Sequence, residues 1–520
     1  MSIKYDLSMV KTILAGIILY NNETNLLALS AKYERFIASS SGVPIFSRTF
    51  DDETKINNQI NNDFIGDVID TKLGYMISIP ITYNYEIGTL QKRDGKNPTV
   101  VDENMMSVEQ EVIDNFIKKN NIDDLNLETV KFTSVCGTSP RLFYIDTDGE
   151  IAALNFKPWE VVYVYNDSET KLLAAVRYYI ETVVDNEFNQ KSLIKVEFYT
   201  DNEVHYLIEE TIDNDGSTAA EQSTSSIPRF EYDESVEGGP VQKHGFNRVP
   251  ITEYVNNEER QGDCDKILPL IDAYDRILSD QASEIEQFRL AYLAVYGLEA
   301  TDEDLAKLKQ TGAFKMTADG KVEFITKDMN ATALENLISK LEENIFKFAR
   351  SANFSDQSFF GNLSGIAIKY KLIKLEHKCS VTEMKMKRAD LDMWDIISDA
   401  YAKKRVFFDP FSIARTFTRK IPVNLLEEAR IQRELKGLVS NETRLALASF
   451  VTNPHKEIQK IQKEMESGIT SMLDNFYDTL EDVAPDEGTM SDNEQFNEWR
   501  LEHRNSGKAP EAINDDESNN

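Results

Sequence analysis

The chain has 520 residues, with 89 acidic and 57 basic side chains and a formal net charge of −32 at pH 7. A chain of this length exceeds a single hydrophobic core, so we expect several domains. The acidic balance excludes a general nucleic-acid binder, because that kind of binding depends on basic patches that neutralise phosphates.

The N-terminal part and the cysteines carry no export, membrane or metal signature. The apolar run from Thr12 to Leu19 lacks a strongly basic start and a small-residue cleavage pattern. No apolar run approaches the roughly 20 residues that span a bilayer. Cys136, Cys264 and Cys379 lie far apart without a CxxC pair, so neither a disulfide framework nor a zinc site is predicted. We expect synthesis in a reducing cytoplasm and no membrane partner.

The first part of the chain, to about Asn257, has a mixed α/β pattern. Runs rich in β-branched and aromatic residues predict strands at Met76–Tyr85, Val161–Tyr165, Leu172–Val183 and Ile194–Tyr199. From Ile212 to Gly239 the composition changes to Asp, Ser, Thr, Glu and Gly, with too little apolar content to pack, so this segment predicts a mobile surface loop.

Beyond Asp263 the apolar residues follow the period of a helix. Two amphipathic segments, Ile267 to Phe288 and Leu334 to Phe348, repeat apolar side chains at three- and four-residue steps. Between them, residues 291–330 contain a short acidic helical pattern and the run AFKMTADGKVEFIT, whose Asp319-Gly320 pair predicts a two-residue hairpin turn. Two helices therefore bracket a small α/β insertion.

The most informative stretch runs from Gln357 to Lys403. A loop with two adjacent aromatic residues, Phe359 and Phe360, leads through Gly365 into a segment without Gly or Pro, which predicts one very long helix. A loop at the head of such a helix suits a part that projects into a shared space better than a closed catalytic pocket. Beyond it, we expect a strand at Ser412–Val423, helices from Asn424 to Met465 and a partly disordered acidic tail.

The motifs of common enzymes are missing from the sequence. It contains no GxxxxGK[ST] phosphate loop, no GxGxxG and no HExxH. In GNLSG, Gly361 to Gly365, the serine stands one residue further from the first glycine than in the GxSxG nucleophile elbow, so capping of the long helix explains Ser364 better than catalysis. The five histidines are scattered: His205, His244, His377, His455 and His503. Asp390, Asp392 and Asp395 suit a solvated helix surface better than a metal site.

Five motifs in order resemble one family, the portal proteins of tailed bacteriophages of the SPP1 type. These motifs are VPIFSR, NNDFIGDVIDTKLGYMISIPITY, HGFNRVPITEYVNNEERQGDCDKILPLIDAYDRILSDQASEIEQFRLAYLAVYG, FGNLSGIAIKYKLIKLEHK and IPVNLLEEARIQRELKGLVSNETRLALASFVTNPHKEIQKIQKE. The resemblance covers roughly Tyr33 to Glu466. Ser78 stands where the family usually has Gly, and Lys374 stands where a helix-kinking Pro is common.

The resemblance implies an α+β portal fold that assembles into a ring. Its parts would be a wing with an N-terminal arm, two stem helices, a small α/β clip, a tunnel loop, a long wing helix, a wing strand, a helical crown and an acidic tail. In chain order these parts would occupy residues 1–262 (wing), 263–290 (first stem helix), 291–330 (clip), 331–350 (second stem helix), 351–365 (tunnel loop), 366–404 (long helix), 405–424 (wing strand), 425–472 (crown) and 473–520 (tail).

The resemblance also implies a function and a set of partners. Such proteins form a ring, dodecameric in the virion, at one capsid vertex, and double-stranded DNA passes through the channel during packaging and ejection. The expected partners are the terminase large subunit, head-completion or connector proteins, and the major capsid and scaffolding proteins. No cofactor, metal or catalytic residue is implied. A minor head or connector protein is the alternative, although a connector is usually much smaller.

Candidate contact residues follow from these assignments. In the tunnel loop they are Asp356, Gln357, Phe359, Phe360, Asn362 and Leu363. For the two phenylalanines, packing between neighbouring subunits is as good an explanation as DNA contact. On the stem, Lys340, Lys347 and Arg350 are candidates for a modest basic ring around the channel. The two lysines have an alternative in ion pairs with Glu342, Glu343 or a neighbour's acids, which gain little energy when exposed.

Overall fold

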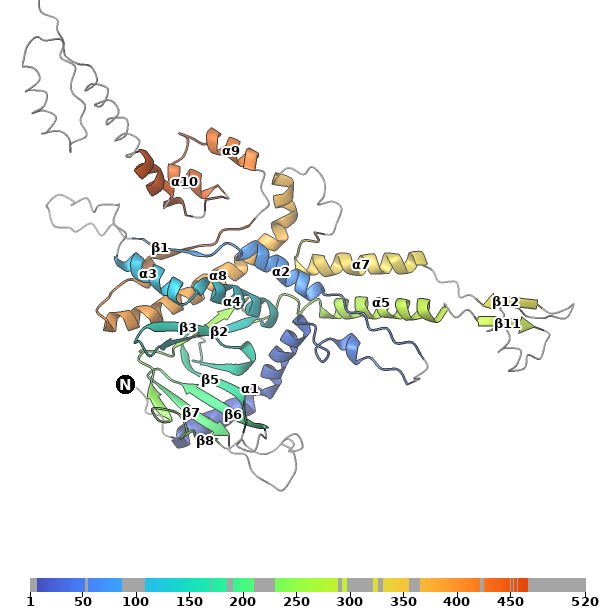
Figure 1. Ribbon diagram of the computed structural model, residues 1–520, viewed down its shortest axis with the longest axis horizontal. Helices are drawn as coiled ribbons and strands as arrows, with labels where there is room; N and C mark the ends of the chain where they lie inside the picture. The colour runs from blue at the N-terminus through green and yellow to red at the C-terminus, as the bar shows by residue number, and fades with distance from the viewer. Residues whose placement is uncertain are drawn as a thin grey trace, which may run out of the picture.

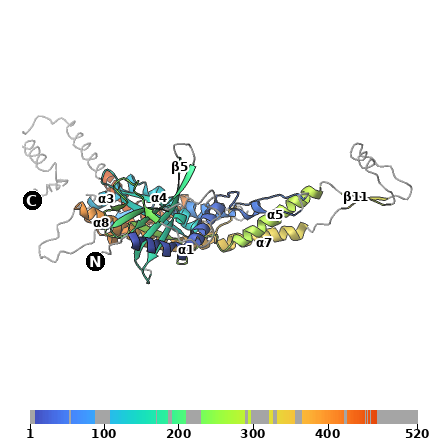
Figure 2. The same ribbon diagram turned by 90° about the horizontal axis from the view of Figure 1, so that it is seen from below.

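The computed structural model describes residues 7–51, 55–86, 108–168, 170–184, 190–209, 230–288, 292–296, 321–325, 331–354, 365–420, 425–448, 450–451, 453–455 and 457–465. A body of mixed helices and sheets carries a long helical hairpin that projects from one side (Figure 1). Seen from below, the hairpin extends far beyond the body, with β11 near its end (Figure 2). Among the described helices, none is long and apolar enough to cross a membrane.

Helices make up most of the body and all of the projecting shaft. Those of the body before the shaft are α1 (Leu7–Phe36), α2 (Phe64–Met76), α3 (Val108–Lys119) and α4 (Ile122–Cys136). The shaft consists of α5 (Leu268–Phe288) and α7 (Ala331–Ala349), and the long helix α8 (Gly365–Lys403) follows. The helices α9 (Leu425–Glu434) and α10 (Asn441–Ala446) lie beyond the body on the side away from the large sheet (Figure 1). Short 3-10 turns are η1 (Pro44–Ser47), η2 (Pro158–Glu160) and η4 (Pro410–Ser412).

The strands of the described residues form four separate sheets. The largest has the order β4-β5-β6-β7-β8, with β9 also paired to β7. Its members are β4 (Val161–Tyr165), β5 (Leu172–Val184), β6 (Gln190–Tyr199), β7 (Glu203–Glu209), β8 (Phe230–Tyr232) and β9 (Val241–Lys243). A three-stranded sheet has the order β10-β2-β3, from β10 (Ile251–Val255), β2 (Thr138–Ile145) and β3 (Ile151–Asn155). Two pairs complete the set: β1 (Thr82–Tyr85) with β13 (Ile413–Thr416), and β11 (Tyr292–Tyr296) with β12 (Lys321–Ile325).

The main core forms around α8. Trp394 is fully buried, and its ring lies 5.7 Å from Tyr83, 5.6 Å from Phe116 and 6.2 Å from Phe408 between centroids. Residues from α2, α3, α4, α5, α7 and α8 share this one hydrophobic cluster. Because one long helix contacts elements from both ends of the chain, it ties the base of the projecting hairpin to the rest of the body.

Several sequence expectations need correction. The strand predicted at Met76–Tyr85 is wrong for its first part: α2 continues to Met76 because Ile65, Val68, Ile69 and Met76 bury one helical face, and only Thr82–Tyr85 is a strand. Within the expected loop, Phe230–Tyr232 is a strand with Phe230 1% exposed.

The other predicted strands are confirmed, are shorter than expected, or lie partly outside the described residues. The strands predicted from Val161 to Tyr199 are confirmed as β4, β5 and β6. The strand predicted at Ser412–Val423 is shorter, Ile413–Thr416, and residues 421–424 lie outside the described part. Strand β12 follows the predicted Asp319-Gly320 turn and pairs with β11, while residues 313–320 lie outside the described part.

Candidate functional site

The projecting hairpin and its junction with α8 form the candidate site. Strands β11 and β12 pair at its far end, so α5 and α7 run antiparallel (Figure 1). The predicted loop residues Asp356, Gln357, Phe359, Phe360, Asn362 and Leu363 lie outside the described residues. What the structure describes is the hairpin that precedes this loop, the helix that follows it, and the contacts that fix both.

One face of α5 is held by an extended segment, residues 57–62, which we call the strap. The backbone N–H groups of Asn58, Ile60 and Asn62 donate hydrogen bonds to Ser283 Oγ (3.0 Å), Ser279 Oγ (2.9 Å) and Asp275 Oδ1 (3.0 Å), respectively. Every second strap residue thus meets every fourth helix residue. Two extended residues span about 6.6 Å and four helical residues about 6.0 Å, so the two repeats match closely enough to form a ladder.

Ion pairs reinforce the same attachment. Lys32 pairs with Asp265 at 2.7 Å, Arg48 pairs with Asp280 at 2.6 Å, and Arg35 pairs with Asp272. The three basic residues come from α1 and the segment after η1; Asp265 lies just before α5, and Asp272 and Asp280 lie within it. The first stem-like helix is therefore fixed to the N-terminal part of its own chain along much of its length.

The second helix, α7, has no comparable attachment on its outer face among the described residues. Ile345 and Ala349 are buried, whereas Leu337 is 47% and Phe348 is 58% exposed. The layers follow the order strap, α5, α7, so the outer face of α7 points away from the strap (Figure 1). This face carries two of the predicted stem residues, Lys340 and Lys347.

The three predicted stem cations differ in their surroundings. Lys340 forms an exposed ion pair with Glu343 at 2.7 Å, one turn along α7. Lys347 lies 5.9 Å from the centroid of the Phe348 ring. Arg350 is exposed and ends the helix with φ of 54°, the left-handed conformation that often terminates helices. All three side chains are exposed, and no hydrogen bond or ion pair of the described residues joins any two of them.

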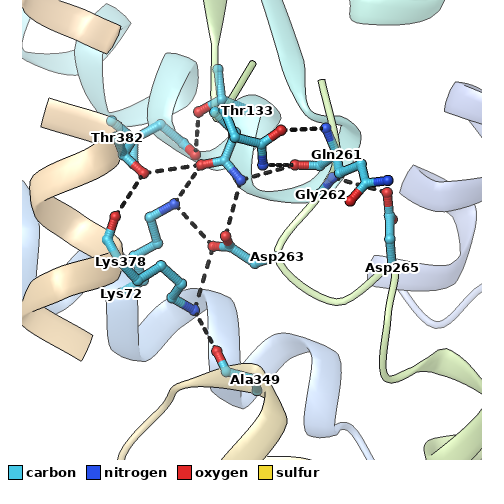
Figure 3. Close-up of polar contacts among 12 residues, drawn as sticks. Lys72, Thr133, Gln261, Gly262, Asp263, Asp265, Ala349, Lys378 and Thr382 are labelled. Atoms are coloured by element: carbon cyan, nitrogen blue, oxygen red, sulfur yellow. Dashed lines mark hydrogen bonds and ion pairs between the residues drawn. The ribbon is translucent and has the colours of Figure 1, made fainter. Parts of the chain in front are cut away.

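A buried polar cluster fixes the junction between the base of the hairpin and α8 (Figure 3). Lys72 of α2 and Lys378 of α8 lie 2.9 Å and 3.6 Å from Asp263 Oδ2, and Lys378 also donates to the carbonyl of Ala349 at 3.0 Å. Asn256 accepts from Lys72 and Thr382 and donates to Asp263 and the Gln261 carbonyl. This one cluster joins the approach to α5, the end of α7 and the side of α8.

The charges in this cluster hold one another in the ionised state. Burial alone would raise the pKa of Asp263, but the ammonium groups of Lys72 and Lys378 and the amide of Asn256 lower that pKa to about 2. Burial lowers the pKa of Lys72, and Asp263 opposes that change. A carboxylate shared by two lysines is a structural anchor, because a charge left without its partner here carries a large desolvation penalty.

A second buried network contradicts one expectation from the sequence. Asp390 is fully buried and accepts hydrogen bonds from Tyr254 (3.0 Å) and Tyr83 (3.2 Å), so its assignment to a solvated helix surface was wrong. Burial raises the pKa of Asp390. Asp395, in contrast, pairs with Arg248 at 2.6 Å near the surface. The three aspartates therefore do not gather into one site.

The sequence reasoning missed the buried anchors. Lys72 stands at helical spacing from the buried Val68, Ile69 and Met76, and this place on the apolar face was the signal that could have marked it as buried. The Asn256-Asn257 pair was noticed as part of a motif, and the structure gives its physical reason: both side chains bond to Gln261 and shape the turn before α5. Within the described ranges, no group of three His, Cys, Asp or Glu residues is placed to hold a metal.

Comparison with known proteins identifies the family. The family described as phage portal protein, SPP1 Gp6-like, matches residues 10–470. The portal protein of Bacillus phage SPP1 is 27% identical over 422 residues, which cover 80% of this chain and 77% of that protein. The portal protein of Clostridium phage phiCD119 is 25% identical over 477 residues, covering 88% of this chain and 95% of that protein. The chain belongs to the SPP1-like family of phage portal proteins.

Proposed function

We propose that this protein forms a ring at one vertex of a phage capsid, dodecameric in the virion, through which double-stranded DNA enters during packaging and leaves during ejection. Membership of the portal family supports the role. The observation that carries the proposal is the α5–α7 hairpin, which projects from the body as a shaft (Figure 2). Copies arranged side by side around an axis would join these shafts into a tube.

The domain assignments made from the sequence remain our proposal for the parts of the subunit. Residues 1–262, the long helix 366–404 and the strand region 405–424 would form the wing; 263–290 and 331–350 the stem; 291–330 the clip; 351–365 the tunnel loop; 425–472 the crown; and 473–520 the acidic tail. The role would be structural and not catalytic. The protein would be made in the host bacterial cytoplasm and end in the virion.

The proposed channel uses the outer face of α7 and the tunnel loop. Lys340, Lys347 and Arg350 would line the channel, because this face points away from the strap. A strongly acidic chain offers few phosphate-neutralising contacts, so DNA meets few deep binding sites and can slide. The loop would guide DNA by steric and polar contact.

At the far end of the shaft, the clip would dock the terminase large subunit and later the head-completion or connector proteins, and the wing would meet the capsid and scaffolding proteins.

Electron microscopy of the purified full-length protein tests the proposal directly. We expect class averages viewed down the particle axis to show rings with an open centre. A monomer, a dimer or a closed globular particle in assembly-promoting salt would contradict it.

A second test replaces Phe359 and Phe360 with Ala, which we expect to leave ring assembly intact and reduce DNA packaging. Normal packaging in that variant would remove the loop assignment and leave the ring untouched.

A further inference from the structure

Within the described part of the chain, strand β1 pairs with a neighbouring strand, β13, along one edge only. The hydrogen bond from the Glu86 N–H to the Ser412 carbonyl, 2.7 Å long, shows which backbone groups face β13. Because these groups alternate along a strand, the N–H and C=O groups of Tyr83 and Tyr85 point to the other edge. An unpaired strand edge is a template for another extended chain.

One position on this free edge is filled by a side chain. The Gln110 amide of α3 accepts a hydrogen bond from the Tyr85 N–H at 2.7 Å and donates one to the Tyr83 carbonyl at 3.0 Å. A primary amide offers the same kind of donor and acceptor as a peptide group, so Gln110 takes the place of one peptide group of a neighbouring strand. The edge therefore accepts an amide with both hydrogen bonds formed.

The next position along the same edge holds no amide among the described residues. It is formed by the Ile81 carbonyl and the Tyr83 N–H. Both point away from β13, because the Thr82 N–H and C=O, which belong to the same two peptide groups, face that strand. No hydrogen bond to either group is formed within the described residues. A docked peptide group would gain both hydrogen bonds.

These two backbone groups border a cavity of about 340 Å³ that lies between β1, α3 and the start of α4. Its apolar walls include Ile79 and Pro80, which precede the strand, and Ile117 of α3. The charged residues among its described lining, Asp114 of α3 and Asp123 of α4, are both acidic. The cavity thus combines an open strand edge, an apolar wall and negative charge, which together favour an extended chain with basic side chains.

We infer that this edge of β1 binds an extended segment of a partner protein that carries basic side chains. The segment adds to β1 as a further strand, so that one of its peptide groups fills the position between Ile81 and Tyr83. A Lys or Arg of the segment lies on the side of Asp114 and Asp123. Main-chain hydrogen bonds supply affinity, and the carboxylates and the apolar wall select the sequence. The inference goes beyond the proposed channel and does not require a ring.

A peptide-binding assay on the full-length protein tests the inference. The probe is a short labelled peptide of alternating valine and arginine, and fluorescence anisotropy follows its binding. We expect this peptide to bind and the same peptide with glutamate in place of arginine not to bind. Methylation of the backbone nitrogen at every second residue should abolish binding in one of the two possible patterns and spare it in the other, because only one edge of the added strand faces β1. Equal binding of both methylated peptides would overturn the inference.

Charge reversal distinguishes this site from a general attraction to an acidic protein. Asp123→Arg should weaken binding of the arginine peptide by about fivefold or more. The matched control is Asp124→Arg, because Asp124 is the next residue, is exposed and does not line the cavity. The control should leave binding within about twofold of the wild type. Equal losses in the two variants would show that the peptide binds without this site.

Hydrogen exchange gives a readout that needs no variant. The Tyr83 amide should exchange more slowly when the peptide is bound, whereas the amides of Thr82 and Asn84, which face β13, should change little. An unchanged Tyr83 amide would overturn the inference. If isolated subunits bind the peptide and assembled rings do not, a second copy covers the edge, and the inference of a partner segment is wrong. Failure of the wild-type protein to form rings would contradict the portal proposal alone.

Discussion

The two shaft helices are attached to the protein in very different ways. Helix α5 is held on one side by hydrogen bonds from the strap and by ion pairs from α1 and the segment after η1, and on the other side by α7. Helix α7 packs its buried face on α5 and α2, and its outer side chains are exposed. The difference shows that one helix serves as the fixed support and the other presents a surface.

The two helices also differ in which of their polar side chains stabilise the fold. On α5, Asp275 and Ser279 are 2% and 0% exposed, yet each has a backbone N–H group of the strap as its partner. On α7, the polar residues Ser339 and Lys340 are exposed and make only local contacts or none that fix another segment. A polar side chain stabilises the fold mainly where its loss would leave a buried group unsatisfied.

The largest effect is expected where α5 begins. Asp263→Ala leaves Lys72 and Lys378 buried without their shared carboxylate, so we expect the free energy of unfolding to fall by about 3–5 kcal/mol. Chemical denaturation of the full-length protein would measure the change. Glu343→Ala on α7 removes an exposed pair and serves as the matched control. If both substitutions lowered the free energy of unfolding equally, α5 and α7 would not differ in how firmly they are attached.

The same carboxylate predicts a dependence on pH. Because the folded state lowers the pKa of Asp263 from 3.8 to about 2, its stabilising contribution is complete above pH 4 and is lost as the pH falls towards 2. The contribution amounts to about 2 kcal/mol. The gap in stability between wild type and Asp263→Asn should therefore narrow across this window. A constant gap from pH 5 to pH 2 would show that the carboxylate is not the group that holds the junction.

The ladder on α5 should show a smaller, graded effect. Ser279→Ala and Ser283→Ala each leave one strap N–H group without its acceptor, so we expect losses of about 1 kcal/mol apiece in unfolding free energy. Ser339→Ala on the exposed face of α7 should change stability by less than about 0.5 kcal/mol. Faster hydrogen exchange at Asn58 and Ile60 in the two α5 variants would locate the effect in the strap.

The smallest effect is expected on the outer face of α7. Lys340 and Glu343 are 61% and 59% exposed, and such pairs contribute between about 0 and 1 kcal/mol. Lys340→Gln should therefore leave the melting temperature of the subunit almost unchanged, which a thermal melt would show. A marked loss of stability would mean that α7 is held by contacts as strong as those of α5.

The sequence predicted the helices of the shaft and the long helix well, because their apolar periodicity is uninterrupted and Gly365 marks a boundary. It failed where the decisive contacts connect distant segments. Asp390 has the composition of a surface position, and only the approach of Tyr83 and Tyr254 buries it. The start of the Met76–Tyr85 run was misassigned because β-rich composition there coincides with the buried end of an amphipathic helix.

The candidate site was predicted unevenly for the same reason. The stem cations stay a prediction; the structure shows that Lys340, Lys347 and Arg350 are exposed, as polar positions on an amphipathic helix are expected to be. The strap was not found, since its contacts come from backbone N–H groups that every residue except proline possesses. Local composition carries no record of which backbone groups will meet a serine more than 200 positions away.

The ladder between the strap and α5 depends on two backbone repeats that are nearly, but not fully, equal in length. Two extended residues are about 0.6 Å longer than four helical ones. From the first to the third hydrogen bond, the donors of the strap therefore move out of step with the acceptors of α5 by only about 1.2 Å. A longer ladder would exceed what hydrogen bonds tolerate, and the polar contacts do end near Glu286. A one-residue deletion between Asn58 and Asn62 would shift the strap by half of its two-residue repeat. The N–H groups beyond the deletion would then point away from α5. Length in this segment is therefore constrained more tightly than composition.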